Sequence, residues 1–125
     1  MTVIDSGISA LWTVACSMDA LTRNRGVAVL LADGEQVALF RLDDDTLHAV
    51  GNIDPFGRAA VMSRGIVGDR GGEPTVASPL LKQVFSLIDG QCLDDRTVSL
   101  PTYETDVTDG VVRIGARTTS ATGES

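Results

Sequence analysis

Hydrophobic residues along the chain fall into short runs that are separated by acidic or glycine-containing turns. Two β-rich runs, residues 26–31 and 36–42, flank the pair Asp33-Gly34. An Asp-Gly pair between such runs is a strong hairpin signal, because both central residues of the tight turn take positive φ. The pair Asp109-Gly110 predicts another hairpin near the end of the chain. Strands are expected at residues 10–16, 26–31, 36–42, 46–50, 75–77, 83–87, 98–107 and 111–114.

Turns and loops account for most of the remaining residues. Ser17 stands where it would cap a single helical turn over residues 17–21. Residues 65–74 are rich in glycine and predict a loop with at most one short strand; they lack the GxxxxGK[ST] pattern of a phosphate cradle. The three aspartates at 43–45 predict a solvated turn, because the spaced oxygen ligands of a calcium loop are missing.

Short runs of this kind, without any longer helical pattern, predict an all-β fold. We expect a small sandwich or barrel of antiparallel strands and hairpins, with at most short helical turns. At 125 residues the chain is long enough for one core and too short for two domains. The expected organisation is a flexible N-terminus at residues 1–9, a folded domain at 10–116, and a disordered tail at 117–125, which has no apolar periodicity.

The charge of the chain excludes several classes of partner. With 17 acidic and 10 basic residues, the formal net charge is −7. Such a surface repels phosphate backbones and anionic lipid, so we expect neither nucleic-acid nor membrane binding. No apolar run approaches the roughly 20 residues needed to span a bilayer. The apolar stretch at residues 8–16 lacks the positively charged segment of a signal peptide, and a cytoplasmic location is expected.

Cysteine and histidine, the usual ligands of zinc and iron–sulfur sites, are scarce. Cys16 and Cys92 are the only cysteines, which predicts neither a disulfide framework nor a zinc site. Both are interpreted as small hydrophobic residues rather than redox groups. His48 is the only histidine, and one imidazole cannot build a metal site, so a solvent-facing or hydrogen-bonded ring is expected. The sequence therefore predicts no metal site and no catalytic residue in this chain.

Two segments, residues 52–59 and 77–87, have the frame of iron–sulfur loops. Their Asp-Pro-Phe-Gly and Ser-Pro-Leu-Leu sequences resemble the Rieske family, in which each cluster loop supplies one cysteine and one histidine. Every ligand position of that pattern holds a different residue. Cysteines are replaced by Asp54 and Ser78, and histidines by Phe56 and Leu81.

These replacements remove the chemistry of a cluster site. A Rieske centre needs two thiolates on one iron and two imidazoles on the other. Phe56 and Leu81 have no donor atom, and Asp54 with Ser78 cannot replace a pair of soft thiolates. The resemblance therefore implies a Rieske-like fold in which this chain holds no [2Fe–2S] cluster and no other cofactor.

Further segments resemble, more narrowly, the small subunits of assimilatory NADH-dependent nitrite reductases. That family keeps the Rieske frame without the cluster ligands, and the order and spacing of the segments carry the match. In the family, the large subunit carries FAD, a [4Fe–4S] cluster and siroheme, and it reduces nitrite to ammonium with electrons from NADH. The resemblance implies a non-catalytic subunit that stabilises, orients or regulates that large subunit. The matching segments are residues 37–41, 52–56, 63–69, 77–85 and 90–93.

Two alternatives remain open at this point. The chain can be a stand-alone Rieske-like interaction module without redox activity or an oxidoreductase partner. A ferredoxin-like electron carrier is disfavoured by the missing ligands. An adjacent gene for a much larger siroheme-binding reductase would distinguish the nitrite reductase subunit from the stand-alone module.

The resemblance also implies where a partner binds. In electron-carrying relatives the cluster loops meet the redox partner, so the same surface is the candidate contact with the large subunit. The alternative is that the apolar side chains of the loops pack onto each other as a small core, because burial is the usual fate of such side chains; they are those of Pro55, Phe56, Pro79, Leu80 and Leu81. The two interpretations are compatible if Leu80 points outward while Phe56 and Leu81 point inward. The candidate partner-binding residues are Phe56, Arg58, Arg64, Leu80 and Lys82.

Overall fold

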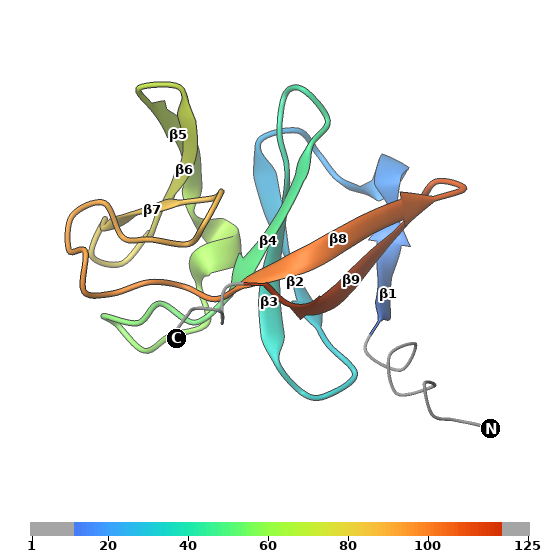
Figure 1. The fold of residues 1–125 in the computed structure, drawn as a ribbon, viewed down its shortest axis with the longest axis horizontal. Coiled ribbons are helices and arrows are strands. Elements are labelled where there is room, and N and C mark those ends of the chain that lie inside the picture. Colours follow the sequence, from blue (N-terminus) through green and yellow to red (C-terminus); the bar gives the residue numbers. More distant parts are fainter. Residues whose placement is uncertain (1–11, 119–125) are drawn as a thin grey trace.

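This computed structural model describes residues 12–118, and short strands are their main regular secondary structure (Figure 1). The all-β prediction is confirmed, since the helical segments among these residues are two three-residue 3-10 turns. None of the described helical segments is long and apolar enough to cross a membrane. The elements are β1 (Thr13–Ser17), η1 (Met18–Ala20), β2 (Arg25–Leu30), β3 (Gln36–Arg41), β4 (Leu47–Gly51), η2 (Met62–Arg64), β5 (Ile66–Arg70), β6 (Glu73–Ala77), β7 (Val84–Ser86), β8 (Thr102–Thr108) and β9 (Val111–Arg117).

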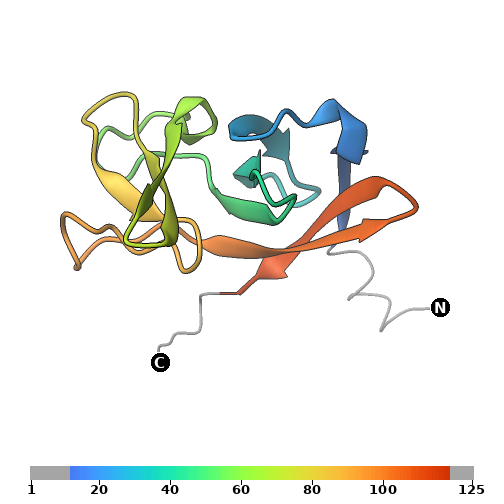
Figure 2. The ribbon, with the colours of Figure 1, turned by 90° about the horizontal axis from the view of Figure 1, so that it is seen from above.

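Six of the strands form a sheet that curls into a nearly closed barrel (Figure 2). The strand order is β1-β9-β8-β4-β3-β2, and every neighbouring pair is antiparallel. Thr13 Oγ1 accepts a hydrogen bond of 3.0 Å from the backbone N–H of Ala32, which links β1 to the chain just after β2. The buried residues that fill this barrel are Leu21, Leu31, Val37, Leu39, Ala49, Tyr103, Val112 and Ile114.

The strand β3 joins the two hydrophobic cores of the domain. Residues 37–40 are all fully buried, because both faces of this strand are covered. Val37 and Leu39 belong to the barrel core, whereas Ala38 and Phe40 pack against the smaller sheet. This double burial explains why the sequence shows a continuous apolar run here instead of alternation. Gly26 on β2 leaves room for Phe40, since a Cβ atom at Gly26 would lie 2.6 Å from Phe40 Cε2.

A smaller three-stranded sheet, in the order β5-β6-β7, packs beside the barrel and positions the two cluster-like loops. The first loop follows β4 and precedes η2, and the second loop connects β6 to β7. Phe56, Val67 and Val98 are partly buried against the core of this sheet. The buried residues of that core are Ala38, Phe40, Leu42, Val50, Met62, Val76, Phe85, Leu87, Cys92 and Leu100.

The glycine-rich residues 65–74 contain β5, a turn and the first two residues of β6, which pairs with β5. The prediction allowed one short strand here but missed that the segment is a hairpin. Gly71 and Gly72 take positive φ values of 62° and 92° and reverse the chain between the two strands. These glycines weakened the strand pattern in the sequence because they supply the turn that the hairpin needs.

The two Asp-Gly pairs behave differently. Both residues of Asp109-Gly110 have positive φ, 53° and 76°, as the hairpin prediction requires. At Asp33-Gly34, Gly34 alone has positive φ, at 93°. The N–H of Gly34 donates to the carbonyl of Leu31 at 2.9 Å, so this hairpin closes through a longer loop than the two-residue turn that was expected.

Three predicted boundaries need correction. The strand expected at 98–107 begins at Thr102, because Pro101 cannot donate to the ladder. Ser17 makes no side-chain hydrogen bond as a cap of η1. Arg117 ends β9, and the N–H of Thr118 binds the carbonyl of Thr102 at 2.8 Å, so the folded part extends beyond residue 116. Residues 1–9 and 119–125 of the expected flexible ends lie outside the described range. Residues 10 and 11, at the start of the predicted domain, also lie outside it.

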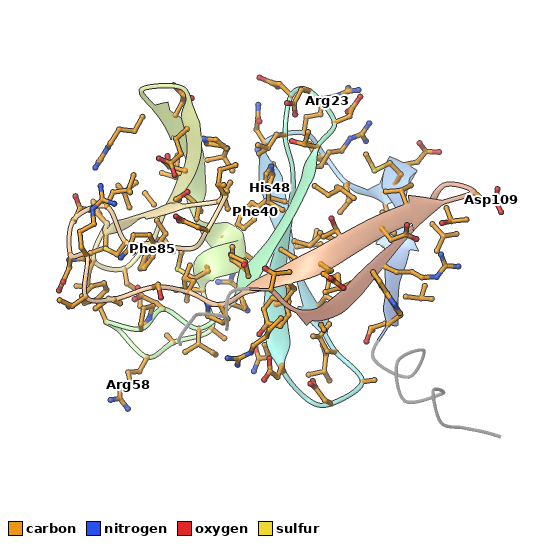
Figure 3. The ribbon with its side chains drawn as sticks, viewed as in Figure 1. Arg23, Phe40, His48, Arg58, Phe85 and Asp109 are labelled. Carbon is orange, nitrogen blue, oxygen red and sulfur yellow. The ribbon has the colours of Figure 1, made fainter. Side chains whose placement is uncertain are left out.

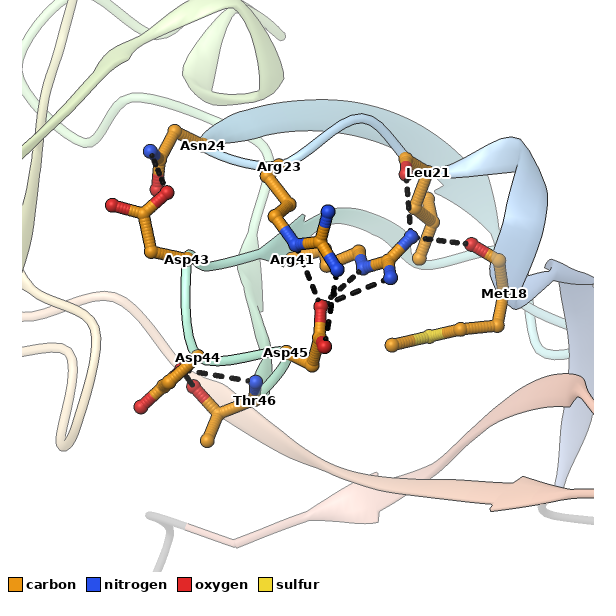
Figure 4. Close-up of polar contacts among 9 residues, drawn as sticks. All are labelled: Met18, Leu21, Arg23, Asn24, Arg41, Asp43, Asp44, Asp45 and Thr46. Carbon is orange, nitrogen blue, oxygen red and sulfur yellow. Dashed lines mark hydrogen bonds and ion pairs between the residues drawn. The ribbon is translucent and has the colours of Figure 1, made fainter.

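Two of the three aspartates of residues 43–45 anchor their turn to the chain after η1 (Figure 4). Asp43 accepts from Asn24 and Asp45 from Arg23, whereas Asp44 bonds to Thr46 within the turn. Asp45 pairs with both Arg23 and Arg41 at 2.9 Å. Hydrogen bonds from these two guanidinium groups lower the pKa of Asp45. Arg41 also donates to two backbone carbonyls beside η1, at 3.2 and 3.0 Å. The turn is exposed, as predicted, and its carboxylates bond to neighbouring side chains.

Candidate functional site

The first cluster-like loop, residues 54–59, is closed by two backbone hydrogen bonds. The N–H of Asp54 donates to the carbonyl of Ala59 at 2.8 Å, and the N–H of Arg58 donates to the carbonyl of Asp54 at 2.7 Å. Arg58 has a φ of 60°, in the left-handed region. A residue other than glycine is uncommon in that region and marks a constrained turn.

The second loop, residues 78–83, repeats this arrangement. The N–H of Ser78 donates to the carbonyl of Gln83 at 2.9 Å, and the N–H of Lys82 donates to the carbonyl of Ser78 at 3.1 Å. Lys82, at the same place in its loop as Arg58, has a φ of 64°. The two loops therefore share one backbone frame although their side chains differ.

The residues at the two cysteine positions are bonded to each other. Asp54 and Ser78 are 0% and 1% exposed, and Ser78 Oγ donates a short hydrogen bond to Asp54 Oδ2. Asp54 Oδ1 accepts from the N–H groups of Phe56 and Gly57, at 2.8 and 3.2 Å. Ser78 Oγ accepts weakly from the N–H of Leu80 at 3.3 Å. This buried contact links the loops at the point where a cluster would link them through metal.

The residues at the two histidine positions point to different surroundings. Phe56 is half-buried against the core, with its ring 6.2 Å from that of Phe85 at an angle of 47°. Leu81 is 57% exposed and Leu80 is 46% exposed. The alternative in which the apolar side chains of both loops form a small core is therefore wrong for Leu80 and Leu81, which are exposed, whereas Phe56 packs against the core of the smaller sheet.

The donor set of these loops does not fit a [2Fe–2S] cluster. A carboxylate and a hydroxyl replace the two thiolates, and the two side chains without donor atoms replace the imidazoles. Asp54 already uses its oxygens on N–H and O–H donors of the loops. Across residues 12–118, no group of three or more His, Cys, Asp or Glu side chains is arranged to hold a metal ion.

The remaining candidate ligands lie away from the loops. Cys16 is on β1, and Cys92 is buried in the core beside Phe85; both are free thiols. His48 is on β4, where its Nδ1 lies 3.1 Å from the carbonyl oxygen of Leu87 and its Nε2 lies 3.1 Å from Thr46 Oγ1. Burial lowers the pKa of His48. The hydrogen-bonded ring expected from the sequence is thus present, and it connects the barrel to the chain after β7.

Only some of the candidate partner-binding residues come together. Arg58 and Lys82 are exposed on the two loops beside Leu80. Arg64 is on η2 and lines a separate hollow of about 520 Å³ together with Arg25 and other residues next to β2. Phe56 is partly buried and packs against the core of the smaller sheet. The structure therefore divides the predicted set into an exposed loop group and residues that lie elsewhere.

One polar cluster was not found by sequence reasoning. Glu35 accepts hydrogen bonds from the hydroxyl of Tyr103 and, at 2.9 Å, from the guanidinium of Arg117. The Tyr103 hydrogen bond, followed by that of Arg117, lowers the pKa of Glu35. Burial and the bond to Glu35 raise the pKa of Tyr103 to about 12. The three residues connect the start of β3 to β8 and β9, so they stabilise the barrel.

Sequence reasoning also missed the hydrogen bond between Asp54 and Ser78. The first loop does carry a local signal for the hydrogen bonds that Asp54 accepts from its own loop. An aspartate in a turn commonly accepts the N–H two residues further on, which is what Asp54 does with Phe56. The long-range half of the contact has no sequence signature, because the two residues are far apart in the chain. Both were interpreted as lost ligands instead of as partners of each other.

Comparison with known proteins agrees with this fold. Residues 11–115 match the Rieske-like [2Fe-2S] domain family. The chain is 46% identical over 104 residues to the nitrite reductase (NADH) small subunit of Escherichia coli K12, covering 82% of this chain and 95% of that protein. It also resembles a crystal structure from Mycobacterium tuberculosis, described as a candidate NADH-dependent nitrite reductase small subunit. That match has a TM-score of 0.81 and 63% identity over 82% of this chain and 92% of the other.

A third relative is a larger protein. The nitrite reductase [NAD(P)H] large subunit of Klebsiella oxytoca contains a segment that is 37% identical over 114 residues, which covers 91% of this chain and 12% of that protein. The family match and the two small-subunit relatives span most of the domain described above. The chain therefore belongs to the Rieske-like [2Fe-2S] domain family and, within it, to the small subunits of NADH-dependent nitrite reductase.

Proposed function

We propose that this chain is a non-catalytic subunit that supports the large subunit of a cytoplasmic NADH-dependent nitrite reductase in nitrate and nitrite assimilation. In this proposal the large subunit carries FAD, a [4Fe–4S] cluster and siroheme and reduces nitrite to ammonium. The small subunit contributes no electron-transfer group of its own.

The observation that carries the proposal is the buried bond between Asp54 and Ser78. Two residues at the cysteine positions satisfy each other's hydrogen-bonding groups, and the loop backbones around them stay in matching conformations. Loops that keep this backbone conformation without cluster ligands can maintain the shape of a contact surface, but they cannot carry electrons through a cluster.

The Klebsiella relative supports the choice of partner. In that protein a segment similar to nearly all of this chain is part of a chain that is named a large subunit. A domain that is separate in one protein and covalently joined in a relative is expected to work beside the same partner in both. The stand-alone module, the alternative function, receives no comparable support.

Co-expression with the large subunit from the same genome tests the proposal. We expect a tagged version of this chain to retain the large subunit through purification, and NADH-dependent nitrite reduction to be found in that complex. The chain purified alone should be colourless and free of stoichiometric iron and sulfide after anaerobic reconstitution. A visible iron–sulfur absorption band would overturn the non-redox role, and failure to retain the large subunit would favour the stand-alone module.

A further inference from the structure

Five residues other than glycine have positive φ among the described positions: Asn24, Asp45, Arg58, Lys82 and Asp109. Asparagine and aspartate tolerate this conformation because their short side chains bond to the local backbone. Arg58 and Lys82 have no such compensation. Both occupy the fifth position of a cluster-like loop, where glycine would fit without strain. A residue with a long cationic side chain takes a strained backbone conformation in both loops, which points to a function for the charged side chain.

The two loops form one continuous surface. A Cβ atom at Gly57 would lie 2.7 Å from Leu80 Cδ1, so the first loop touches the second at this point. Arg58 follows Gly57 in the chain, and Lys82 follows the exposed pair Leu80 and Leu81. We call these four residues, Arg58, Leu80, Leu81 and Lys82, the tip. It combines two exposed apolar side chains with two exposed cations. Its Arg58 lies at the end of the molecule opposite Asp109 (Figure 3).

The tip is basic on an acidic protein. The chain has a net charge of −7, yet residues 55–68 and 74–88 contain neither Asp nor Glu. Asp54, the carboxylate within the loops, is fully buried. Neither Arg58 nor Lys82 forms an ion pair with another residue of the described range. Their charges therefore remain available to groups outside this chain.

We propose that the tip is the docking surface for the large subunit, and that the matching patch of the large subunit is an apolar depression bordered by carboxylates. This inference rests on the proposed function, which supplies the partner. The Klebsiella relative, in which the same domain belongs to a large-subunit chain, favours this occupant. An apolar centre with polar and charged groups at the rim is the usual arrangement of a specific contact.

Binding of tip variants to the large subunit tests the assignment. In R58G/K82G, glycine accepts the left-handed backbone, so the charges are removed while the loops keep their conformation. We expect the affinity for the large subunit to fall at least tenfold at low salt, with a weaker dependence on salt concentration, and Tm to stay equal or rise. L80S/L81S should lower the affinity by a similar factor and lower Tm only slightly, because each leucine is about half exposed.

Matched controls lie at the opposite end of the molecule. D109G replaces another left-handed residue by glycine, and V107S replaces another exposed apolar residue. Both should bind the large subunit as the wild type does. Wild-type affinity in both tip variants would overturn the tip assignment and leave the proposed function intact, whereas a wild-type chain that does not bind the large subunit would overturn both.

Two further measurements exclude other occupants. Analytical ultracentrifugation of the chain alone should show the same oligomeric state for the wild type and R58G/K82G. Flotation with vesicles that contain phosphatidylserine should recover neither protein. Self-association or vesicle binding that is lost in R58G/K82G would assign the tip to a second copy or to an anionic lipid surface, and would overturn the proposal.

Discussion

The two cluster-like loops share a backbone conformation and differ in where their side chains lie. In the first loop, Phe56 packs against Phe85, and the Asp54 carboxylate accepts three hydrogen bonds. In the second loop, Leu80 and Leu81 face solvent, and Ser78 is the buried side chain. The first loop therefore packs its large apolar side chain against the hydrophobic core, whereas the second loop leaves its leucines at the surface.

This difference shows what can replace a metal cluster as a structural link. Four ligand positions that would converge on one cluster are divided here between two tasks. The cysteine positions keep the loops together through the Asp54–Ser78 bond, which is buried and satisfies both side chains. The histidine positions no longer converge, since Phe56 extends the core and Leu81 is left exposed. Substitutions in the two loops should consequently have effects of different kinds.

The largest expected effect is that of Asp54→Ala. This variant leaves two backbone N–H groups and the Ser78 hydroxyl without their acceptor in a buried place. We expect the free energy of unfolding to fall by roughly 3 kcal/mol, as measured by urea denaturation. Asp33→Ala is the control, because Asp33 accepts one N–H in an exposed turn and should cost less than about 1 kcal/mol. Equal losses in the two variants would show that the hydrogen bonds of Asp54 contribute no more to stability than a single bond in an exposed turn.

The next prediction compares the two histidine positions directly. Phe56→Ala should lower the free energy of unfolding by about 2 kcal/mol, because it removes half of a buried ring contact with Phe85. Leu81→Ala should change it by less than about 0.5 kcal/mol, because the side chain is mostly exposed. Thermal and urea unfolding of both variants under the same conditions measure the difference. A larger loss for Leu81→Ala would break the distinction between a core loop and a surface loop.

Ser78→Ala should have a smaller effect than Asp54→Ala. It removes the bond between the loops but leaves the two N–H donors of the first loop on Asp54. We expect a loss of about 1 kcal/mol in the free energy of unfolding. Ser99→Ala, at an exposed serine, is the matched control. A loss as large as that of Asp54→Ala would mean that the link between the loops, rather than the local turn, carries the stability.

Much of this fold could be predicted because the local signals agree with the global structure. The apolar runs at 26–31 and 36–42 became β2 and β3, and the Asp109-Gly110 turn has the predicted conformation. Strand predictions failed where a residue type that is typical of one kind of element occurs in another. The glycines of residues 65–74 belong to a hairpin turn, and the apolar residues before Pro101 cover the small sheet as a loop.

The position of the candidate site in the chain was predictable from the sequence, but the burial and contacts of its side chains were less so. The loop frame identified Asp54, Phe56, Ser78 and Leu81 as one group from the sequence. Whether each side chain is buried depends on contacts between distant segments, such as Phe56 with Phe85, which a local pattern does not encode. The left-handed conformation of Lys82 and of the equivalent residue in the first loop was likewise not predictable, because neither residue type favours it.

The last prediction concerns the other end of the segment that carries the second loop. His48 fixes the chain after β7 to the barrel through Leu87, whose carbonyl can only accept, so Nδ1 carries the proton. Burial lowers the pKa of His48, although Leu87 and Asp44 partly oppose the shift. The folded state therefore disfavours the second proton, and the unfolded chain binds it first as the pH falls.

Stability should accordingly be at its full value above about pH 6.5 and decline as the pH falls from there, until the folded pKa of His48 is passed. The pKa values of Asp45 and Glu35 are lowered, so these carboxylates stay ionised between about pH 7 and 5.5 and add no slope there. Urea denaturation of the wild type across this interval should show the decline, and His48→Gln should be nearly flat. Because His48 is the only histidine, its ring proton resonances report the same titration by NMR. A His48 ring pKa above that of a free histidine would contradict this prediction, and so would an equal decline of stability in His48→Gln. Either result would leave the Asp54–Ser78 bond as the main attachment of the second loop.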